Sequence, residues 1–152
     1  MKLHIATRHA LFAILELASH PERQMSATDI AEKFNISSNH LAKVMRTLGR
    51  EGMIDASRGV GGGYRFAANP KRLNLLDVIS IFEPLQAPDG GEAGDDTAEG
   101  RALRKVLSEI EDTIRATLSS ITIDTMLKIV RRSDDGKGAE RAVAALQSRR
   151  WS

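Results

Sequence analysis

The fold is decided by residues 26–65, SATDIAEKFNISSNHLAKVMRTLGREGMIDASRGVGGGYR. Ser26 begins a short helical pattern, and Ser37 begins a second one, in which apolar residues recur every three or four positions at Leu41, Val44, Met45 and Leu48. Gly52 ends this pattern, and residues 54–66 have the composition of two short strands around a glycine-rich turn. Two helices joined by a tight turn and followed by a hairpin predict a winged helix-turn-helix, a mainly α fold with a small β-hairpin wing.

The face of the second helix opposite its apolar stripe is polar and carries Ser37, Ser38, Asn39, His40, Lys43, Arg46 and Arg50. A helix in this position places its first turns against base edges in the DNA major groove, where hydrogen-bond donors read the sequence. We therefore expect Asn39, His40 and Lys43 to contact bases, and Arg46 and Arg50 to contact phosphates. The alternative is an ordinary solvated helix face, because these residue types are common on any surface.

The turn of the hairpin predicts a wing that lies against nucleic acid. Its glycines allow the backbone to approach another surface closely, and arginines flank them on both sides. The predicted wing contacts, along a phosphate backbone or in a minor groove, are Arg58, Gly59, Gly61, Gly62, Gly63, Tyr64 and Arg65. A nucleotide-binding phosphate loop is excluded, because no helix follows the glycines directly and no Lys-Ser/Thr pair ends them.

Composition limits the classes of protein to which the chain can belong. Its 152 residues fit one compact domain, or a small domain plus an extension, and an apolar content of 41% suffices for a core. Cysteine is absent, which excludes disulfides and thiolate metal ligands. No apolar run is long enough to span a bilayer and no signal-peptide pattern comes first, so we expect no membrane partner and a cytoplasmic location. Residues 1–72 carry eleven Lys/Arg against six Asp/Glu, the polarity that a DNA-binding half requires.

Outside this motif the chain is predicted to be mostly helical. Apolar spacing predicts helices over residues 5–19 and 74–82. Residues 86–99 are rich in glycine and acids and predict a flexible loop. After the next long helix, the chain predicts a short helix over 123–131, followed by a hinge over 133–138 and a weak basic helix over 139–150.

The long helix, from Gly100 to Thr122, has an apolar stripe that keeps helical spacing for five turns. We expect a stripe of this length to pair with a second copy of the same helix, although packing onto its own domain is the alternative. The predicted dimerisation residues are Leu103, Val106, Leu107, Ile110, Ile114, Leu118 and Ile121.

Three stretches of the sequence resemble the Rrf2 family of bacterial winged-helix repressors: MKLHIATRHAL, DIAEKFNISSNHLAKVMRTLGREG and SRGVGGGYRFA. The similarity is dense over residues 1–83 and continues more loosely through the long helix, where LSSITI resembles the end of the family's dimerisation helix. Within the family, the run from Asn39 to Val44 is most similar to NsrR-like repressors. The resemblance implies a dimeric transcriptional regulator that binds DNA.

Members of the NsrR and IscR type hold an iron–sulfur cluster, and the resemblance places its ligands at positions that carry none here. The three cysteine positions fall at about Asp89, Asp95 and Arg101, the early aspartate of NsrR-like members falls at Arg8, and the histidine of IscR-like members falls near Arg104. A conventional cluster is therefore excluded. The acidic loop fits no EF-hand spacing and the histidines form no i, i+4 pair, so we predict no metal and no cofactor.

We interpret the chain as a sequence-specific DNA-binding transcriptional regulator, a repressor that acts as a homodimer on a two-fold-related operator in double-stranded DNA. Two alternatives remain open: a winged helix that binds a protein, and a regulator that senses a small molecule without a cluster. No arrangement of catalytic residues predicts an enzyme. The predicted organisation is a DNA-binding domain over 1–83, an acidic loop at the degenerate cluster position over 84–99, the dimerisation helix and short helix over 100–132, and a tail over 133–152.

Overall fold

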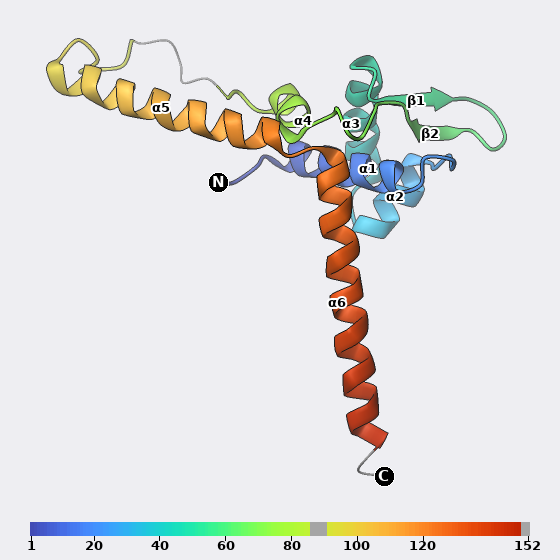
Figure 1. Ribbon diagram of the computed structural model, residues 1–152. Helices are drawn as coiled ribbons and strands as arrows, with labels where there is room; N and C mark the ends of the chain where they lie inside the picture. Colours follow the sequence, from blue (N-terminus) through green and yellow to red (C-terminus); the bar gives the residue numbers. More distant parts are fainter. Residues whose placement is uncertain (86–90, 150–152) are drawn as a thin grey trace.

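The computed structural model describes residues 1–85 and 91–149, and the side chains of residues 1–85, 91–138 and 141. The elements follow in the order α1 (Ile5–Ser19), α2 (Ala27–Phe34), α3 (Ser38–Arg50), β1 (Ile54–Ser57), β2 (Gly63–Phe66), α4 (Leu75–Phe82), α5 (Ala98–Ser120) and α6 (Ile123–Arg149). Helices α1 to α4 and the hairpin form one body, from which α5, α6 and the wing project in different directions (Figure 1). The predicted fold class, mainly α with a β-hairpin wing, is confirmed.

The short helices begin where side chains satisfy the free N–H groups of the first turn. Before α2, the Ser26 hydroxyl accepts a hydrogen bond from the backbone of Asp29, whose carboxylate accepts one from the Ser26 backbone. Asn74 and Asp77 repeat this capping box at α4. The turn between α2 and α3 is tight because Asn35 takes the left-handed conformation, at φ 53°, which asparagine tolerates better than most residues.

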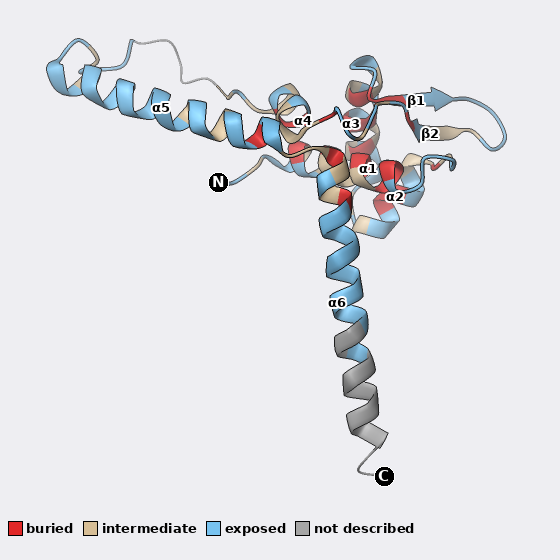
Figure 2. Cartoon of the chain, in the orientation of Figure 1, coloured by how far each residue is buried: buried red, intermediate tan, exposed pale blue. Residues whose placement is uncertain are grey.

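The core is built around α1, which contacts α2, α3, α4, α6 and β2. Ile14 and Leu17 of α1 are fully buried, and the predicted apolar stripe of α3, including Leu41, Met45 and Leu48, is buried with them. Figure 2 shows the buried residues gathered where these elements meet. Burial of each such side chain contributes roughly 1.5–3 kcal/mol, so the packing that buries one face of α3 also fixes which face is left exposed.

The hairpin is anchored at its base and free at its turn. β1 and β2 pair antiparallel, with Ile54 opposite Phe66 and Ser57 opposite Gly63. Ile54 and Phe66 are buried, whereas the rest of β1 and most of the turn are exposed (Figure 2). The wing therefore projects from the body on a stem that the core holds.

The corner between α5 and α6 is fixed to the segment that precedes α4. The backbone N–H of Leu75 donates to the carbonyl of Ile121 at 2.9 Å, and that of Ile123 donates to the carbonyl of Leu73 at 2.8 Å. Ile123 and Leu127 are buried in the core. The first turns of α6 thus complete the body, although they lie well beyond residue 83, where the sequence suggested that the DNA-binding domain ends.

The C-terminal region differs from the prediction. α6 runs without interruption from Ile123 to Arg149, so the short helix over 123–131 and the hinge over 133–138 are wrong. Gly136 and Gly138 lie inside this helix. A helical glycine costs about 1 kcal/mol relative to alanine, but it keeps its backbone hydrogen bonds, and the charged residues around both glycines are compatible with a helix.

The start of α5 also differs, by two residues. The Thr97 hydroxyl accepts a hydrogen bond from the backbone of Gly100 at 3.0 Å, which moves the first helical residue from Gly100 back to Ala98. Residues 91–97, the second half of the predicted acidic loop, form turns before this cap. Residues 86–90 of that loop lie outside the described residues.

A carboxylate at the end of α4 holds the start of α1. Glu83 accepts hydrogen bonds from the Thr7 hydroxyl at 2.7 Å and the His4 backbone at 2.6 Å, and its second oxygen lies 3.1 Å from His4 Nδ1. The hydrogen bond from Thr7, followed by the contacts with His4, lowers the pKa of Glu83 below its ordinary value. Thr7 is fully buried, so Glu83 supplies the partner that its hydroxyl needs.

We predict that Glu83→Ala lowers the free energy of unfolding by about 1–3 kcal/mol, because it leaves the Thr7 hydroxyl buried without a partner. The pKa of Glu83 is lower in the folded state, so its stabilisation is complete above the ordinary carboxylate pKa and is lost as the pH falls below about 4. Denaturant unfolding at pH 7 and pH 3 measures both effects. Glu32→Ala, at an exposed position of α2, is the control. An equal loss of unfolding free energy in both variants would contradict the role of Glu83 as the partner of Thr7.

Candidate nucleic-acid interface

The exposed face of α3 carries the side chains that the sequence assigned to DNA. Ser37 caps the helix by accepting a hydrogen bond from the His40 backbone at 3.4 Å. Ser38, Asn39, Lys43 and Arg46 are exposed, whereas His40 is half-buried. The burial of the opposite face against α1 leaves this row in position to meet a partner as one surface.

Three cations gather along the second half of α3. Lys43, Arg46 and Arg50 line a hollow of about 440 Å³ together with Thr47. The Arg46 and Arg50 side chains each donate to a group on α3 itself, the Ala42 carbonyl and the Thr47 hydroxyl, both at 3.4 Å. Within the described part of the chain, no carboxylate pairs with any of the three cations. Their charge is therefore available to an anionic partner such as a phosphate backbone.

The turn of the wing needs its glycines. Gly59 and Gly61 take positive φ values of 99° and 75°, and the backbone N–H of Gly62 donates to the Gly59 carbonyl at 3.0 Å. A side chain at position 62 would place its Cβ 2.6 Å from the Ser57 carbonyl oxygen, too close for any residue but glycine. Arg58 is exposed beside this turn. The wing thus presents a bare, tightly folded backbone next to a cation.

The return strand of the wing is tied to the segment before α2. Tyr64 exchanges backbone hydrogen bonds of 2.8 and 3.0 Å with Met25, and its half-buried ring packs against the core. Arg65 donates to the carbonyl of Glu22 at 3.4 Å, and its side chain remains exposed. Tyr64 and Arg65 therefore help to orient the wing, while their predicted contact with DNA stays a prediction.

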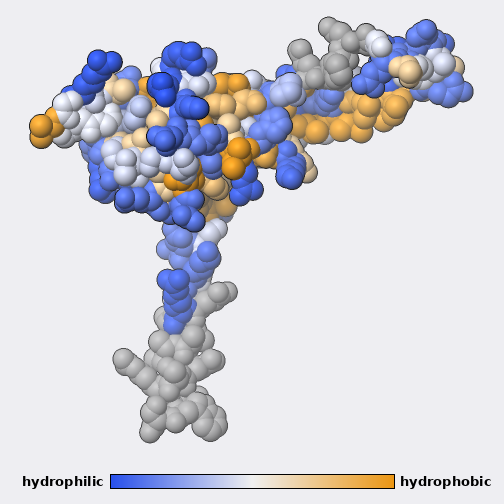
Figure 3. Space-filling model, turned by 180° about the vertical axis from the view of Figure 1, so that it is seen from behind, coloured by the Kyte–Doolittle hydropathy of each residue, from blue (hydrophilic) through white to orange (hydrophobic). Residues whose placement is uncertain are grey.

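The apolar stripe of α5 divides into an exposed and a covered part. Leu103, Val106, Leu107 and Ile110 are 43–60% exposed and belong to the apolar band along this helix in Figure 3. Towards the body, Ile114 and Ile121 are half-buried and Leu118 is 9% exposed. Leu118 is largely covered within its own chain, because α4 packs against this end of α5, and its predicted role in dimerisation stays a prediction.

The segment before α5 is held by hydrogen bonds of its own. The Asp95 carboxylate accepts the backbone N–H groups of Gly91 and its neighbour at 2.9 and 3.1 Å, and these bonds lower the pKa of Asp95. The Arg104 guanidinium donates to the Asp95 carbonyl at 2.9 Å, and Arg101 donates to the Asp96 carbonyl. Two arginines of α5 therefore fasten the loop to the helix.

These residues do not fit an iron–sulfur cluster. Arg101 and Arg104 stand at two positions that the family resemblance gives to cluster ligands, and a third such position, Arg8, places its guanidinium 5.8 Å from the ring centre of Phe12. Asp89 lies outside the described residues. Among the residues that the structure describes, no group of three His, Asp or Glu could hold a metal ion, and the sequence has no cysteine.

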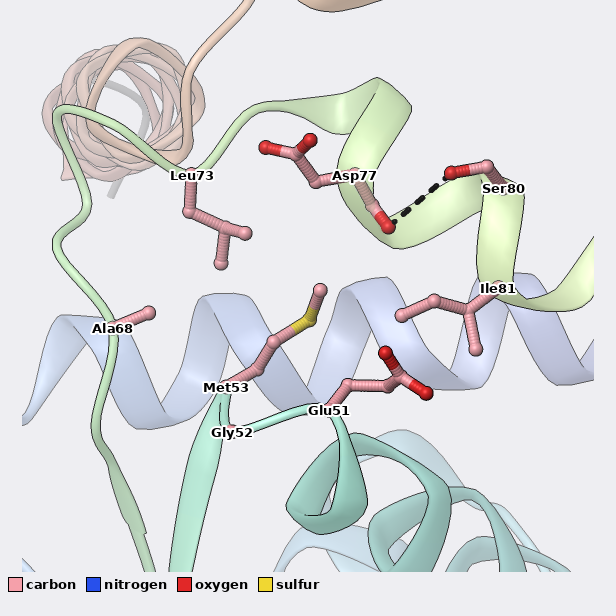
Figure 4. A pocket seen from close by; sticks show the side chains of 8 residues that line it. All are labelled: Glu51, Gly52, Met53, Ala68, Leu73, Asp77, Ser80 and Ile81. Atoms are coloured by element: carbon pink, nitrogen blue, oxygen red, sulfur yellow. Dashed lines mark hydrogen bonds between the residues drawn. The ribbon is translucent and has the colours of Figure 1, made fainter.

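A groove of about 650 Å³ lies between the α3–β1 corner and α4 (Figure 4). Its apolar part includes Met53 and Leu73, which are buried, and Ile81, which is half-buried. Glu51 from the end of α3 and Asp77 from α4 are exposed carboxylates that also line it. The groove therefore connects the end of α3 to α4, the helix that leads to the α5 arm.

Comparison with known proteins agrees with the geometry. A family model described as "Rrf2: Iron-dependent Transcriptional regulator" matches residues 3–129. The chain belongs to the Rrf2 family. A protein of Rhodopseudomonas palustris designated HTH-type transcriptional regulator BadM is 51% identical over 130 residues, which cover 86% of this chain and 83% of that protein.

Solved structures of Rrf2-type regulators superpose on the chain. CymR, named as the global cysteine regulator of B. subtilis, has a TM-score of 0.72 and 26% identity, and the match covers 85% of this chain and 98% of CymR. T. potens IscR has a TM-score of 0.72 and 25% identity, over 88% and 90% of the two chains. The chain is thus a DNA-binding transcriptional regulator of this family and not an enzyme.

No helix within the described residues combines the length and apolar character that crossing a membrane requires.

Sequence spacing missed one contact of the interface: His9 of α1, thirty-one positions from His40, touches the His40 ring. No periodic pattern links two positions so far apart, and only the packing of α1 against α3 brings them together.

We predict that Gly62→Ala weakens binding to duplex DNA by roughly tenfold, because relief of the clash with the Ser57 carbonyl must move the turn of the wing. Fluorescence anisotropy with a labelled duplex measures the dissociation constant. Gly136→Ala is the matched control, since its Cβ would meet no atom within 4 Å. Unchanged affinity in Gly62→Ala would mean that the wing makes no contact with DNA.

Proposed function

We propose that the chain is a sequence-specific repressor that binds a two-fold-related operator as a homodimer and works without an iron–sulfur cluster. The observation that carries this proposal is the row of exposed donors and unpaired cations on α3, beside a wing whose turn is bare backbone. A helix with this arrangement suits the major groove, and the wing suits a phosphate backbone or a minor groove. Repression follows when such a complex covers a promoter.

Within this proposal the DNA-binding residues divide by position. Asn39, His40 and Lys43 lie in the first turns of α3 and read base edges, with Ser37 and Ser38 at the helix start. Arg46, further along α3, and Arg58, on the wing, bind phosphates. The wing glycines Gly59, Gly61, Gly62 and Gly63 allow the approach, and Tyr64 and Arg65 complete the predicted set.

The proposed dimer forms through α5. Leu103, Val106, Leu107 and Ile110 present an exposed apolar row on a helix that extends away from its own body. A contiguous apolar patch on one side of a projecting helix is typical of an interface, and a second copy of α5 offers a matching surface. Two bodies held in this way present two α3 helices to two half-sites, which gives the operator its symmetry.

We further propose that the loop before α5 links the two parts of the chain without sensing iron. Hydrogen bonds from Arg101 and Arg104 to loop carbonyls fasten its described half to α5, where metal ligation would do so in a cluster protein. We propose an organisation of 1–83 for DNA, 84–99 for the loop, 100–132 for pairing and 133–152 for the tail, with the start of α6 added to the DNA-binding body because it packs in the core.

A regulator that senses a small molecule is the second candidate, and the groove between the α3–β1 corner and α4 is the observation that favours it. A molecule bound there would touch the end of the DNA-facing helix and α4 together.

The remaining alternative, a winged helix that binds only protein, does not require salt-dependent affinity for DNA, whereas the proposed function does.

Selection of bound sequences from random duplexes, in near-physiological salt, tests the function and gives the half-site spacing. We expect one two-fold-related motif, and we expect Arg58→Ala to weaken binding to specific and nonspecific duplexes alike. Loss of one phosphate contact should make the slope of log K against log salt shallower by about one unit. Arg132→Ala, exposed on α6, is the control. Recovery of no motif, together with affinity that does not depend on salt, would favour the protein-binding alternative.

Ile110→Asp should convert the dimer to a monomer, because it places a charge at the middle of the exposed row. The single chain should still fold, since Ile110 is exposed in it, but it should lose the stability that pairing contributes. Light scattering at micromolar concentration gives the mass of each variant. Ile129→Asp, at a similarly exposed isoleucine of α6, should remain dimeric, and a wild-type chain that is monomeric would refute the assembly.

A further inference from the structure

Two histidine rings meet at the junction of α1 and α3. The Nδ1 atoms of His9 and His40 lie 2.9 Å apart, and the rings cross at 75° with their centres 4.9 Å apart. Both residues are half-buried, and α1 and α3 pack against each other along this line. The distance is that of a hydrogen bond between the two nitrogens.

A hydrogen bond between the Nδ1 atoms of two neutral imidazole rings requires opposite proton positions. One ring must carry its proton on Nδ1 and donate, and the other must carry its proton on Nε2 and accept. Each ring therefore fixes the tautomer of the other, and the two outer Nε2 atoms differ: one is a donor and the other an acceptor. Two rings that were both fully protonated would have no acceptor between them.

The charges around the pair favour a neutral His9. Burial, followed by the His40 ring and the neighbouring Arg8 guanidinium, lowers the pKa of His9 below its ordinary value. His9 therefore carries a single proton at neutral pH. No carboxylate pairs with either ring in the described part of the chain, so the partner of each Nδ1 is the other ring.

The outer nitrogen of His40 is accessible. No buried side-chain nitrogen or oxygen among the described residues lacks a hydrogen-bond partner, and the only partner of His40's ring is His9. The Nε2 atom of His40 must therefore reach solvent. It does so from the first turns of α3, the part of the helix proposed to meet base edges.

We propose that His9 is a positioning residue for DNA reading: its Nδ1–H donates to Nδ1 of His40 and holds His40 as the tautomer that presents Nε2–H to the DNA. This inference rests on the proposed function, because it assigns the donor in the contact that the proposed function makes between His40 and DNA. The opposite tautomer would present a lone pair. Phosphate oxygens and the N7 and O6 atoms of guanine are acceptors and would repel that lone pair.

The tautomer can be measured without DNA. In wild-type protein labelled with ¹⁵N in its histidine rings, long-range ¹H–¹⁵N spectra at neutral pH should show His40 as the Nε2–H form and His9 as the Nδ1–H form. His9→Phe keeps a ring but no donor, and His40 should then populate both tautomers. His9→Asn, whose amide can replace the Nδ1–H donor, should restore the wild-type pattern of His40. Thermal unfolding of each variant verifies that it folds.

The same variants test whether His9 affects the recognition of the DNA sequence by His40. On the selected operator, His9→Phe should lose roughly tenfold in affinity, His9→Asn should recover most of it, and binding to nonspecific duplex should change little. His20→Phe, at the far end of α1, is the control and should behave as wild type. Replacement of one base pair should lower the affinity of the wild type but leave the affinity of His40→Gln unchanged. That base pair is the one that His40 reads.

Each outcome decides the inference. A single unchanged His40 tautomer in His9→Phe, or equal losses in His9→Phe and His9→Asn on all duplexes, would overturn it and leave His9 as a packing residue. A wild-type protein that binds no duplex would overturn the proposed function and with it the reading role of His40. That result is distinct, because the ring spectra would still show whether His9 sets the tautomer.

Discussion

Most elements of the body pack on α1, and the rest of the structure depends on these contacts. α2, α3, α4, α6 and β2 all touch this helix, and its residues Ile14 and Leu17 have no exposed surface. An ion pair between buried Glu16 and exposed Lys33 ties α2 to it, and Glu83 ties the end of α4 to its first turn. Because α3 packs against α1 through its apolar face, its polar face is left exposed to solvent.

The three projecting parts of the molecule have different physical origins. The wing projects because its stem is buried at Ile54 and Phe66 while its glycine turn has no apolar side chain to bury except Val60, which is fully exposed. α5 projects because only its last turns are covered by the body, which leaves four large apolar residues in solvent. α6 projects because Ile123 and Leu127 are buried while residues 128–138 are exposed. An exposed apolar row is costly in water, whereas an exposed charged helix is not, which supports the proposed pairing through α5.

The chain keeps the architecture of an iron-dependent family without the residues that would hold iron. Arg101 and Arg104 lie where ligands are expected and instead donate hydrogen bonds to the loop before α5. A guanidinium cannot ligate a metal, but it can hold backbone carbonyls in place. The connection between loop and long helix therefore persists as a structural tie. In such a chain, a signal would have to reach α3 by another route, and the groove beside the α3–β1 corner is the described hollow that touches both α3 and α4.

The sequence by itself determined the local structure. Caps at Ser26 and Asn74 and the apolar spacing of α3 predicted the elements of the body and the exposed face of the reading helix, because such signals act over three or four residues. It misjudged α6, since two glycines resemble a hinge although they break no hydrogen bond. Only the tertiary structure decided which end of the α5 stripe is covered, that Glu83 holds α1, and that His9 meets His40. Those contacts join residues thirty or more positions apart, and no short-range pattern reports them; the packing around α1 brings them together.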